Sequence, residues 1–212
     1  PKADPETEIL FTQNTAYSID MTDHGSAAAS SLMTALRTTY DASIAIGYSP
    51  LVSTSIYCGD YSKQQLLWVM AGNYAVSQGE YTGAELRQMM EWLVNVKDNG
   101  ANPIRHRNYM PVTSGMEYKV TEYEQGKFRL EELTVNGAPL DDTATYTVFV
   151  AGTDVWIENE VYCSCPMPEN LKTKRTEYAI EGADSRSCLK DSLAVSKQFP
   201  APSEYLTIVQ GE

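Results

Sequence analysis

Apolar residues recur with helical spacing between residues 81 and 93. They fall at positions i, i+3, i+4 and i+7, in the order Leu86, Met89, Met90 and Leu93. This spacing places all four on one helix face, which predicts a helix with one buried side. Thr82 and Glu85 form the T-x-x-E pattern of a capping box, in which each side chain bonds a backbone N–H at the helix start. We expect loss of Thr82 to cost more stability than loss of Glu85, whose return bond we expect to be more exposed.

Three other stretches also predict helices. The Ala/Ser-rich residues 26–39 carry an apolar face, and Asp23 is placed to cap that helix. A short helix over residues 64–69 would take Asp60 as its cap. A last helix is predicted over residues 187–197.

Short apolar or alternating runs predict strands. The predicted strands are 8–12, 43–46, 74–77, 109–113, 116–123, 127–135, 146–151 and 205–209. Asn136-Gly137, between two such runs, indicates a hairpin turn because both residues tolerate positive φ. Residues 158–187 break the pattern and are interpreted as an insertion. Helices and strands interleaved in this way indicate a mixed α/β (α+β) fold, with residues 1–22 as a lead-in and 23–212 as one domain.

Composition narrows the classes of partner. With 28 acidic against 16 basic residues among 212, the chain carries a formal net charge of −12. Such a chain repels polyanions, so it is not expected to bind nucleic-acid polymers. A small anion could bind only at a local cluster of cations, and the one evident from the sequence is Arg105-His106-Arg107. A solvated loop is the favoured interpretation of that cluster. No apolar run is long enough to predict a membrane span.

Four cysteines leave several possibilities open. Cys163, Cys165 and Cys188 cluster in a Pro-rich region that would suit a disulfide in a secreted protein, whereas Cys58 stands apart. Zinc is disfavoured because there is one C-x-C, no second pair and only two histidines. Buried or free thiols are the favoured alternative.

An ordered string of short motifs resembles the C-terminal domain of the 5'-nucleotidase family, over about residues 23–210 without the 158–187 segment. The motifs are Asp41-Ala-Ser-Ile-Ala-Ile46, Gly59-Asp-Tyr-Ser62, Met70-Ala-Gly-Asn73, Tyr81-Thr-Gly-Ala-Glu-Leu86, Thr113-Ser-Gly115 and Val135-Asn-Gly-Ala-Pro-Leu140. Each motif is weak alone, but their order and spacing together carry the resemblance.

The resemblance implies a two-domain, extracellular, periplasmic or cell-surface phosphoesterase. In such proteins the N-terminal domain holds two divalent metal ions and hydrolyses the ester, while the C-terminal domain grips the nucleoside between two aromatic rings. This chain has two histidines and no G-N-H-(E/D) segment. The resemblance therefore implies a nucleoside- or phosphoester-binding domain with no cofactor and no catalytic residues of its own. Its partner would be an N-terminal metallophosphoesterase domain of the same polypeptide.

The same resemblance assigns candidate binding residues. They are Asn73, Ser114, Gly115, Phe149 and Asp154. For Phe149 and Asp154, a packed strand residue followed by a turn is the alternative.

Two departures from the family pattern predict weak nucleoside binding. Ala71 stands where the family has a stacking phenylalanine, and the arginine of the family's G-G-x-R loop is missing from residues 48–56. Tyr48 or Tyr74 could supply the missing ring. A non-catalytic binding or scaffold domain, which keeps the fold but has lost nucleotide recognition, is the second interpretation.

Overall fold

The computed structural model describes residues 7–48, 51–70, 72–94, 110–152 and 167–211. Its elements, in chain order, are β1 (Ile9–Gln13), α1 (Ala27–Thr39), β2 (Ile44–Tyr48), β3 (Gly59–Ser62), α2 (Lys63–Val69), β4 (Ala75–Thr82), α3 (Gly83–Leu93), β5 (Pro111–Ser114), β6 (Met116–Glu124), β7 (Lys127–Val135), β8 (Ala138–Pro139), β9 (Thr145–Ala151), α6 (Glu169–Glu177), β10 (Ala179–Asp184), α7 (Ser185–Ser196) and β11 (Leu206–Gln210). This is the mixed α/β architecture that the sequence predicts.

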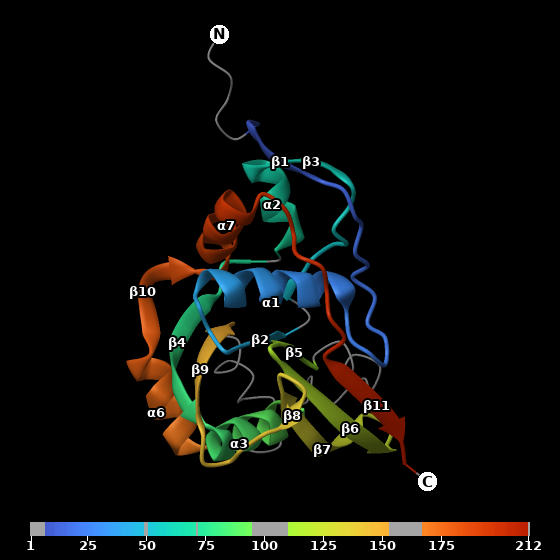
Figure 1. Ribbon diagram of the computed structural model, residues 1–212, viewed down its shortest axis with the longest axis vertical. Helices are drawn as coiled ribbons and strands as arrows, with labels where there is room; N and C mark the ends of the chain where they lie inside the picture. The colour runs from blue at the N-terminus through green and yellow to red at the C-terminus, as the bar shows by residue number, and fades with distance from the viewer. Residues whose placement is uncertain (1–6, 49–50, 71, 95–109, 153–166, 212) are drawn as a thin grey trace.

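A five-stranded sheet with the order β10-β4-β9-β2-β5 forms the centre of the fold. β2 is a continuous apolar run whose residues Ile44, Ala45 and Ile46 are fully buried, as expected of a strand covered on both faces. Helix α1 packs against β2, β5 and α7. It crosses the middle of the molecule, with α2, α7 and the β1–β3 ribbon on one side and α3 on the other (Figure 1).

A second sheet has the order β11-β6-β7-β8. The predicted hairpin turn is confirmed between β7 and β8, where Asn136 and Gly137 have φ values of 52° and 77°. The C-terminal strand β11 runs parallel to β6, so the last described residues complete this sheet. Within the predicted lead-in, β1 pairs with β3 and buries Phe11, which stacks on Tyr61 at 5.2 Å between ring centroids.

Two predicted helix caps are wrong. Helix α1 is capped by Ser26, whose side chain accepts a hydrogen bond from the Ala29 N–H, rather than by Asp23. Helix α2 is capped by Ser62 in a capping box with Gln65. Asp60 instead lies in β3 and accepts a 2.6 Å hydrogen bond from Thr12, because pairing with β1 extends the strand as far as Ser62.

The predicted capping box of α3 is confirmed. The Glu85 N–H donates to the Thr82 hydroxyl at 3.2 Å, and the Thr82 N–H donates to the Glu85 carboxylate at 2.8 Å. The four apolar residues predicted to share a face are all buried. Glu85 is less exposed than expected, because its side chain also accepts a 2.6 Å bond from Lys174 of α6 and is only 19% exposed.

We expect Thr82→Ala to lower the free energy of unfolding by about 0.5–2 kcal/mol, and Glu85→Gln to cost at least as much at neutral pH. Burial raises the pKa of Glu85, but hydrogen bonds from Lys174 and Thr82 outweigh burial and leave that pKa below its ordinary value. A lowered carboxyl pKa contributes stability above the ordinary value of about 4.3, and this contribution disappears as the pH falls through the folded-state value.

Urea denaturation of both variants and the parent at pH 7 and at progressively lower pH measures these effects. The gap between Glu85→Gln and the parent should close in acid. A gap that stays constant across the carboxyl range would show that the ionised form is not the stabilising one.

The segment interpreted as an insertion contains regular structure in its described part. Residues 169–177 form α6 and residues 179–184 form β10, which pairs with β4 at the edge of the central sheet. Neither was predicted, because α6 buries only Leu171 and β10 is an edge strand with mostly exposed or half-buried residues, so neither shows a clear apolar period.

Cys58 is exposed and Cys188 is buried, and both carry free thiols. Cys163 and Cys165 lie outside the described residues. In the part of the chain that the structure describes, no helix combines the length and apolar character needed to cross a bilayer.

Candidate functional site

Asn73 lies just before β4, where the strands of the central sheet end. There the Gly152 N–H donates to the Ala75 carbonyl at 2.9 Å, and Asp184 at the end of β10 pairs with Ala75. The beginning of β4 and the ends of β9 and β10 therefore lie together at one end of the sheet. Asn73 itself is exposed.

Ser185, the first residue of α7, holds the backbone on both sides of Asn73. Its hydroxyl accepts from the Tyr74 N–H at 3.1 Å and donates to the Gly72 carbonyl at 3.2 Å. Its own N–H donates to the Tyr74 carbonyl at 2.9 Å. Because Ser185 is fully buried, these bonds are shielded from water and fix Asn73 against the start of α7.

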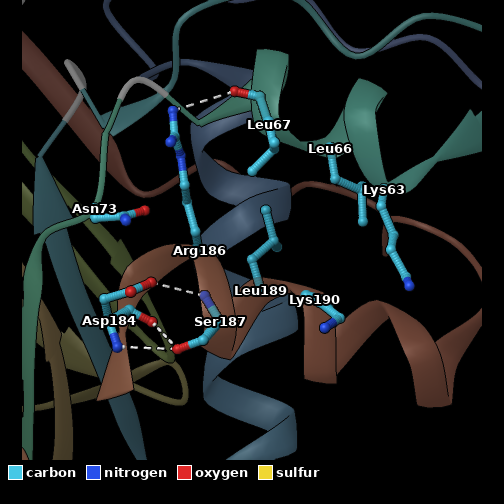
Figure 2. Close-up of a pocket in the computed structure, with 9 residues that line it drawn as sticks. All are labelled: Lys63, Leu66, Leu67, Asn73, Asp184, Arg186, Ser187, Leu189 and Lys190. Carbon is cyan, nitrogen blue, oxygen red and sulfur yellow. Dashed lines mark hydrogen bonds between the residues drawn. The ribbon is translucent and has the colours of Figure 1, made fainter. Parts of the chain in front are cut away.

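A pocket of about 310 Å³ opens between Asn73, α2 and the first turns of α7. Figure 2 shows Arg186 rising from α7 between Asn73 on one side and Leu67 on the other. Leu66, Leu67 and Leu189 supply the apolar part of the wall. The volume is at the lower end of the range typical of small-molecule sites.

Arg186 is the most constrained cation in this pocket. Its Nη2 group donates to the Met70 carbonyl at 3.1 Å and to the Leu67 carbonyl at 3.5 Å, which ties the guanidinium to the end of α2. Its Nε atom is buried and, among the described residues, has no acceptor. Because this atom has almost no accessible surface, a ligand in the pocket cannot reach it, and the donor left without a partner among the described residues is a local cost of holding the guanidinium against the end of α2.

Lys63 and Lys190 add two further cations to the pocket wall. With the described residues, neither lysine nor Arg186 forms an ion pair. The one acidic residue on the wall is Asp184, whose carboxylate already accepts the Ser187 N–H at 2.8 Å as the cap of α7. Three cationic side chains against one carboxylate leave a local surplus of two positive charges on a chain whose net charge is −12.

Ser114 and Gly115 lie elsewhere. Ser114 pairs with Ala45 near the beginning of β2, whereas Asn73 sits beyond the opposite end of the sheet. The Ser114 hydroxyl is buried and accepts a 2.9 Å bond from Arg37 Nε. Gly115 has φ of 79°, and a Cβ there would overlap the Ser43 carbonyl oxygen. The structure therefore does not bring these two residues together with Asn73.

Phe149 lies in the middle of β9, paired with Ala45 of β2 and Gln78 of β4. Its side chain is fully buried and stacks on Tyr40 at 4.8 Å between ring centroids. At 3.3 Å per residue along the strand, Phe149 lies about 10 Å from Gly152, which marks the end of the sheet near Asn73. These contacts are those of the packed-core alternative.

Several residues named from the sequence lie outside the described residues. They are Asp154, Ala71 and the Arg105-His106-Arg107 cluster. Of the two tyrosines considered as replacement rings, Tyr74 is half-buried and packs against the core, and its ring lies 3.1 Å from where a Cβ on Gly72 would stand.

Sequence reasoning missed the cationic residues of the pocket. Lys63 is separated from Arg186 and Lys190 by most of the chain, and Arg186 falls in the segment interpreted as an insertion. The one available signal was the Asp184-Ser-Arg-Ser187 run, which has the cap residue and spacing of a helix start.

The comparisons with known proteins agree with this architecture. Residues 8–153 match the sequence profile of the family described as "5'-nucleotidase, C-terminal domain", and the chain belongs to that family. No curated protein matches the chain.

Solved structures with the same fold share little sequence with this chain. A 5'-nucleotidase precursor from Thermus thermophilus is 16% identical with a TM-score of 0.70, covering 98% of this chain and 41% of its own. An NAD nucleotidase from Haemophilus influenzae is 13% identical with a TM-score of 0.74, covering 98% of this chain and 39% of its own. A sulfate thiohydrolase from Thermus thermophilus is 15% identical with a TM-score of 0.66, covering 99% of this chain and 36% of its own. The chain thus spans about two fifths of the length of these proteins.

Proposed function

We propose that this chain is the substrate-binding C-terminal domain of a 5'-nucleotidase-family phosphoesterase. Its substrate is a nucleotide or a related phosphoester, and an N-terminal metallophosphoesterase domain of the same polypeptide carries out the hydrolysis with two divalent metal ions. The chain itself contributes binding and orientation of the substrate. The polypeptide acts outside the cytoplasm, as the family resemblance implies.

The match over residues 8–153 to the family's C-terminal domain is the observation that carries this proposal. The position of Asn73 supports it, because this motif residue is held by Ser185 at the wall of a pocket. Two of the similar structures are named as nucleotidases, and the chain covers 39–41% of their lengths. Those shares leave room in such proteins for a separate catalytic domain.

We expect the isolated chain to hydrolyse no phosphomonoester with Mn²⁺, Mg²⁺ or Zn²⁺. It has only two histidines and no G-N-H-(E/D) segment, so it lacks the ligand motifs that the family resemblance implies for a two-metal site. A longer polypeptide that joins this domain to a metallophosphoesterase domain should hydrolyse at least one member of a panel of nucleotides and sugar phosphates. Phosphate release in the presence of each metal measures the activity of the isolated chain and that of the longer polypeptide.

Turnover by the isolated chain that is abolished by a mutation within it would overturn the assignment of the chemistry to another domain. The catalytic assignment would also fall if the natural polypeptide held no such domain, or held one without its D-x-H and G-N-H-(D/E) ligands. That result would favour the non-catalytic scaffold interpretation.

A further inference from the structure

We propose that α6 and β10 form a strap that opens as a unit while the rest of the domain stays folded, and that Lys174 and Tyr178 latch this strap over the outer edge of β4. The strap comprises residues 167–184, and it lies along the margin of the central sheet, next to β4 (Figure 1). The inference goes beyond the proposed function, because it concerns a conformational equilibrium of this chain whether or not a catalytic domain is attached.

The strap buries little apolar surface. The one buried residue of α6 is Leu171, and Met167 is buried just before the helix. The N-cap of α6 is Pro168, which makes no side-chain hydrogen bond to the helix start. A helix of nine residues is marginal by itself in water, so α6 depends on its contacts with the rest of the domain. Segments with few buried apolar contacts open at a lower free energy than the whole domain unfolds.

The backbone pairing of the strap is irregular. β10 pairs with β4 through Ala179 and Asp184, and the register shifts between these two positions. Between them Gly182 has φ of 73°, and a Cβ there would meet nothing within 4 Å. On its other side β4 pairs with β9 in continuous register from Val76 to Thr82. The strap can therefore separate from β4 without breaking the ladder between β4 and β9.

Tyr178 forms the first half of the latch. Its hydroxyl donates to the Glu80 carbonyl at 3.1 Å, and its carbonyl accepts from the Gln78 N–H at 2.9 Å. Its ring fills the space that Gly79 leaves, since a Cβ on Gly79 would lie 2.0 Å from the ring. Gly79 does not have a positive φ, so the close approach of the ring, rather than the backbone conformation, requires glycine at this position.

Lys174 forms the second half of the latch. Its Nζ group donates to the Glu85 carboxylate at 2.6 Å and to the Glu80 carbonyl at 3.1 Å, and it lies 5.3 Å from the centre of the Tyr81 ring. The Lys174 and Glu85 side chains are 25% and 19% exposed, so this charge-assisted bond is partly shielded from water. Opening of the strap would uncover the outer edge of β4, and folded proteins keep such edges covered.

Hydrogen–deuterium exchange of the unmodified chain at pH 7, followed by mass spectrometry of its peptides, tests local opening. Peptides from α6 and β10 should exchange together and at least about tenfold faster than peptides from α1, because local opening needs less free energy than global unfolding. Helix α1 is the internal reference, since it packs against β2, β5 and α7. Exchange of α6 at the rate of α1, or unrelated rates for α6 and β10, would overturn the proposal.

Lys174→Gln removes one half of the latch and leaves the Thr82 and Glu85 capping box in place. It should speed exchange of the strap about tenfold and leave α1 unchanged, the scale expected for a lost bond between charged groups. Lys119→Gln is the matched control, because it makes the same change in net charge and Lys119 pairs with Glu132 at 3.0 Å in the other sheet. Equal exchange of the strap in these two variants would exclude Lys174 as part of the latch.

Gly79→Ala tests the other half of the latch. The added methyl group would displace the Tyr178 ring and speed exchange of the strap, while the pairing of β4 with β9 should be preserved because alanine is favoured over glycine within a strand. Tyr178→Ala should also speed exchange of the strap. Adding Gly79→Ala to Tyr178→Ala should then give no further increase, since both changes act on one contact. Additive effects of the two substitutions would show that the ring in the Gly79 space does not hold the strap.

Discussion

Replacing Gly115 with alanine is expected to lower the free energy of unfolding by more than about 3 kcal/mol. Gly115 adopts φ of 79°, where a side chain is strained, and a Cβ would overlap the Ser43 carbonyl oxygen while lying 3.0 Å from Arg37 Cδ. The Ser43 backbone cannot easily move away, because its N–H donates to the Thr147 carbonyl at 2.9 Å within the central sheet. Urea denaturation of Gly115→Ala and the parent measures the loss.

Gly137→Ala is the matched control for this prediction. Gly137 has nearly the same φ, 77°, but its missing Cβ would meet nothing within 4 Å. It should therefore show the conformational cost alone, about 1–2 kcal/mol. Similar losses in the two variants would mean that the close approach to Ser43 does not restrict position 115.

Phe149→Ala is expected to lower the free energy of unfolding by about 3–5 kcal/mol. The ring is fully buried in β9 and stacks on Tyr40, so its removal leaves a cavity in the middle of the central sheet. Phe149→Leu, which refills much of the space, should cost less. Val195→Ala, at a side chain that is 81% exposed, should have little effect and serves as the baseline.

Nucleoside binding by the folded fraction distinguishes a packing role for Phe149 from a ligand role. If Phe149 is a packed-core residue, Phe149→Leu should leave the adenosine affinity unchanged under conditions where the protein is folded. A marked loss of affinity with little loss of stability would instead return Phe149 to the binding site. The two measurements on one variant therefore separate the two interpretations.

Local signals in the sequence determined much of this fold. The α3 helix follows from the spacing of its apolar residues and from the Thr82 and Glu85 capping box, because both signals act within a few residues of each other. The Asn136-Gly137 turn was predictable for the same reason, since positive φ is a property of the residues themselves. The order of short motifs was enough to indicate the family to which residues 8–153 belong.

Only the tertiary structure decided features that depend on distant partners. Ser26 and Ser62, rather than the nearby aspartates, cap their helices, and the Ser62 cap reflects how far β3 extends along β1. α6 and β10 show little periodicity because α6 buries only Leu171 and β10 is exposed at the sheet edge.

The pocket between α2 and α7 is the clearest feature that only the tertiary structure decided. It combines Lys63 and Asn73 from the first half of the chain with Arg186 and Lys190 from α7, and no local pattern links residues so far apart. The sequence determined which residues carry charge. Pairing of β10 with β4, and the hydrogen bonds of Ser185 to the backbone around Asn73, decided which residues line the same pocket.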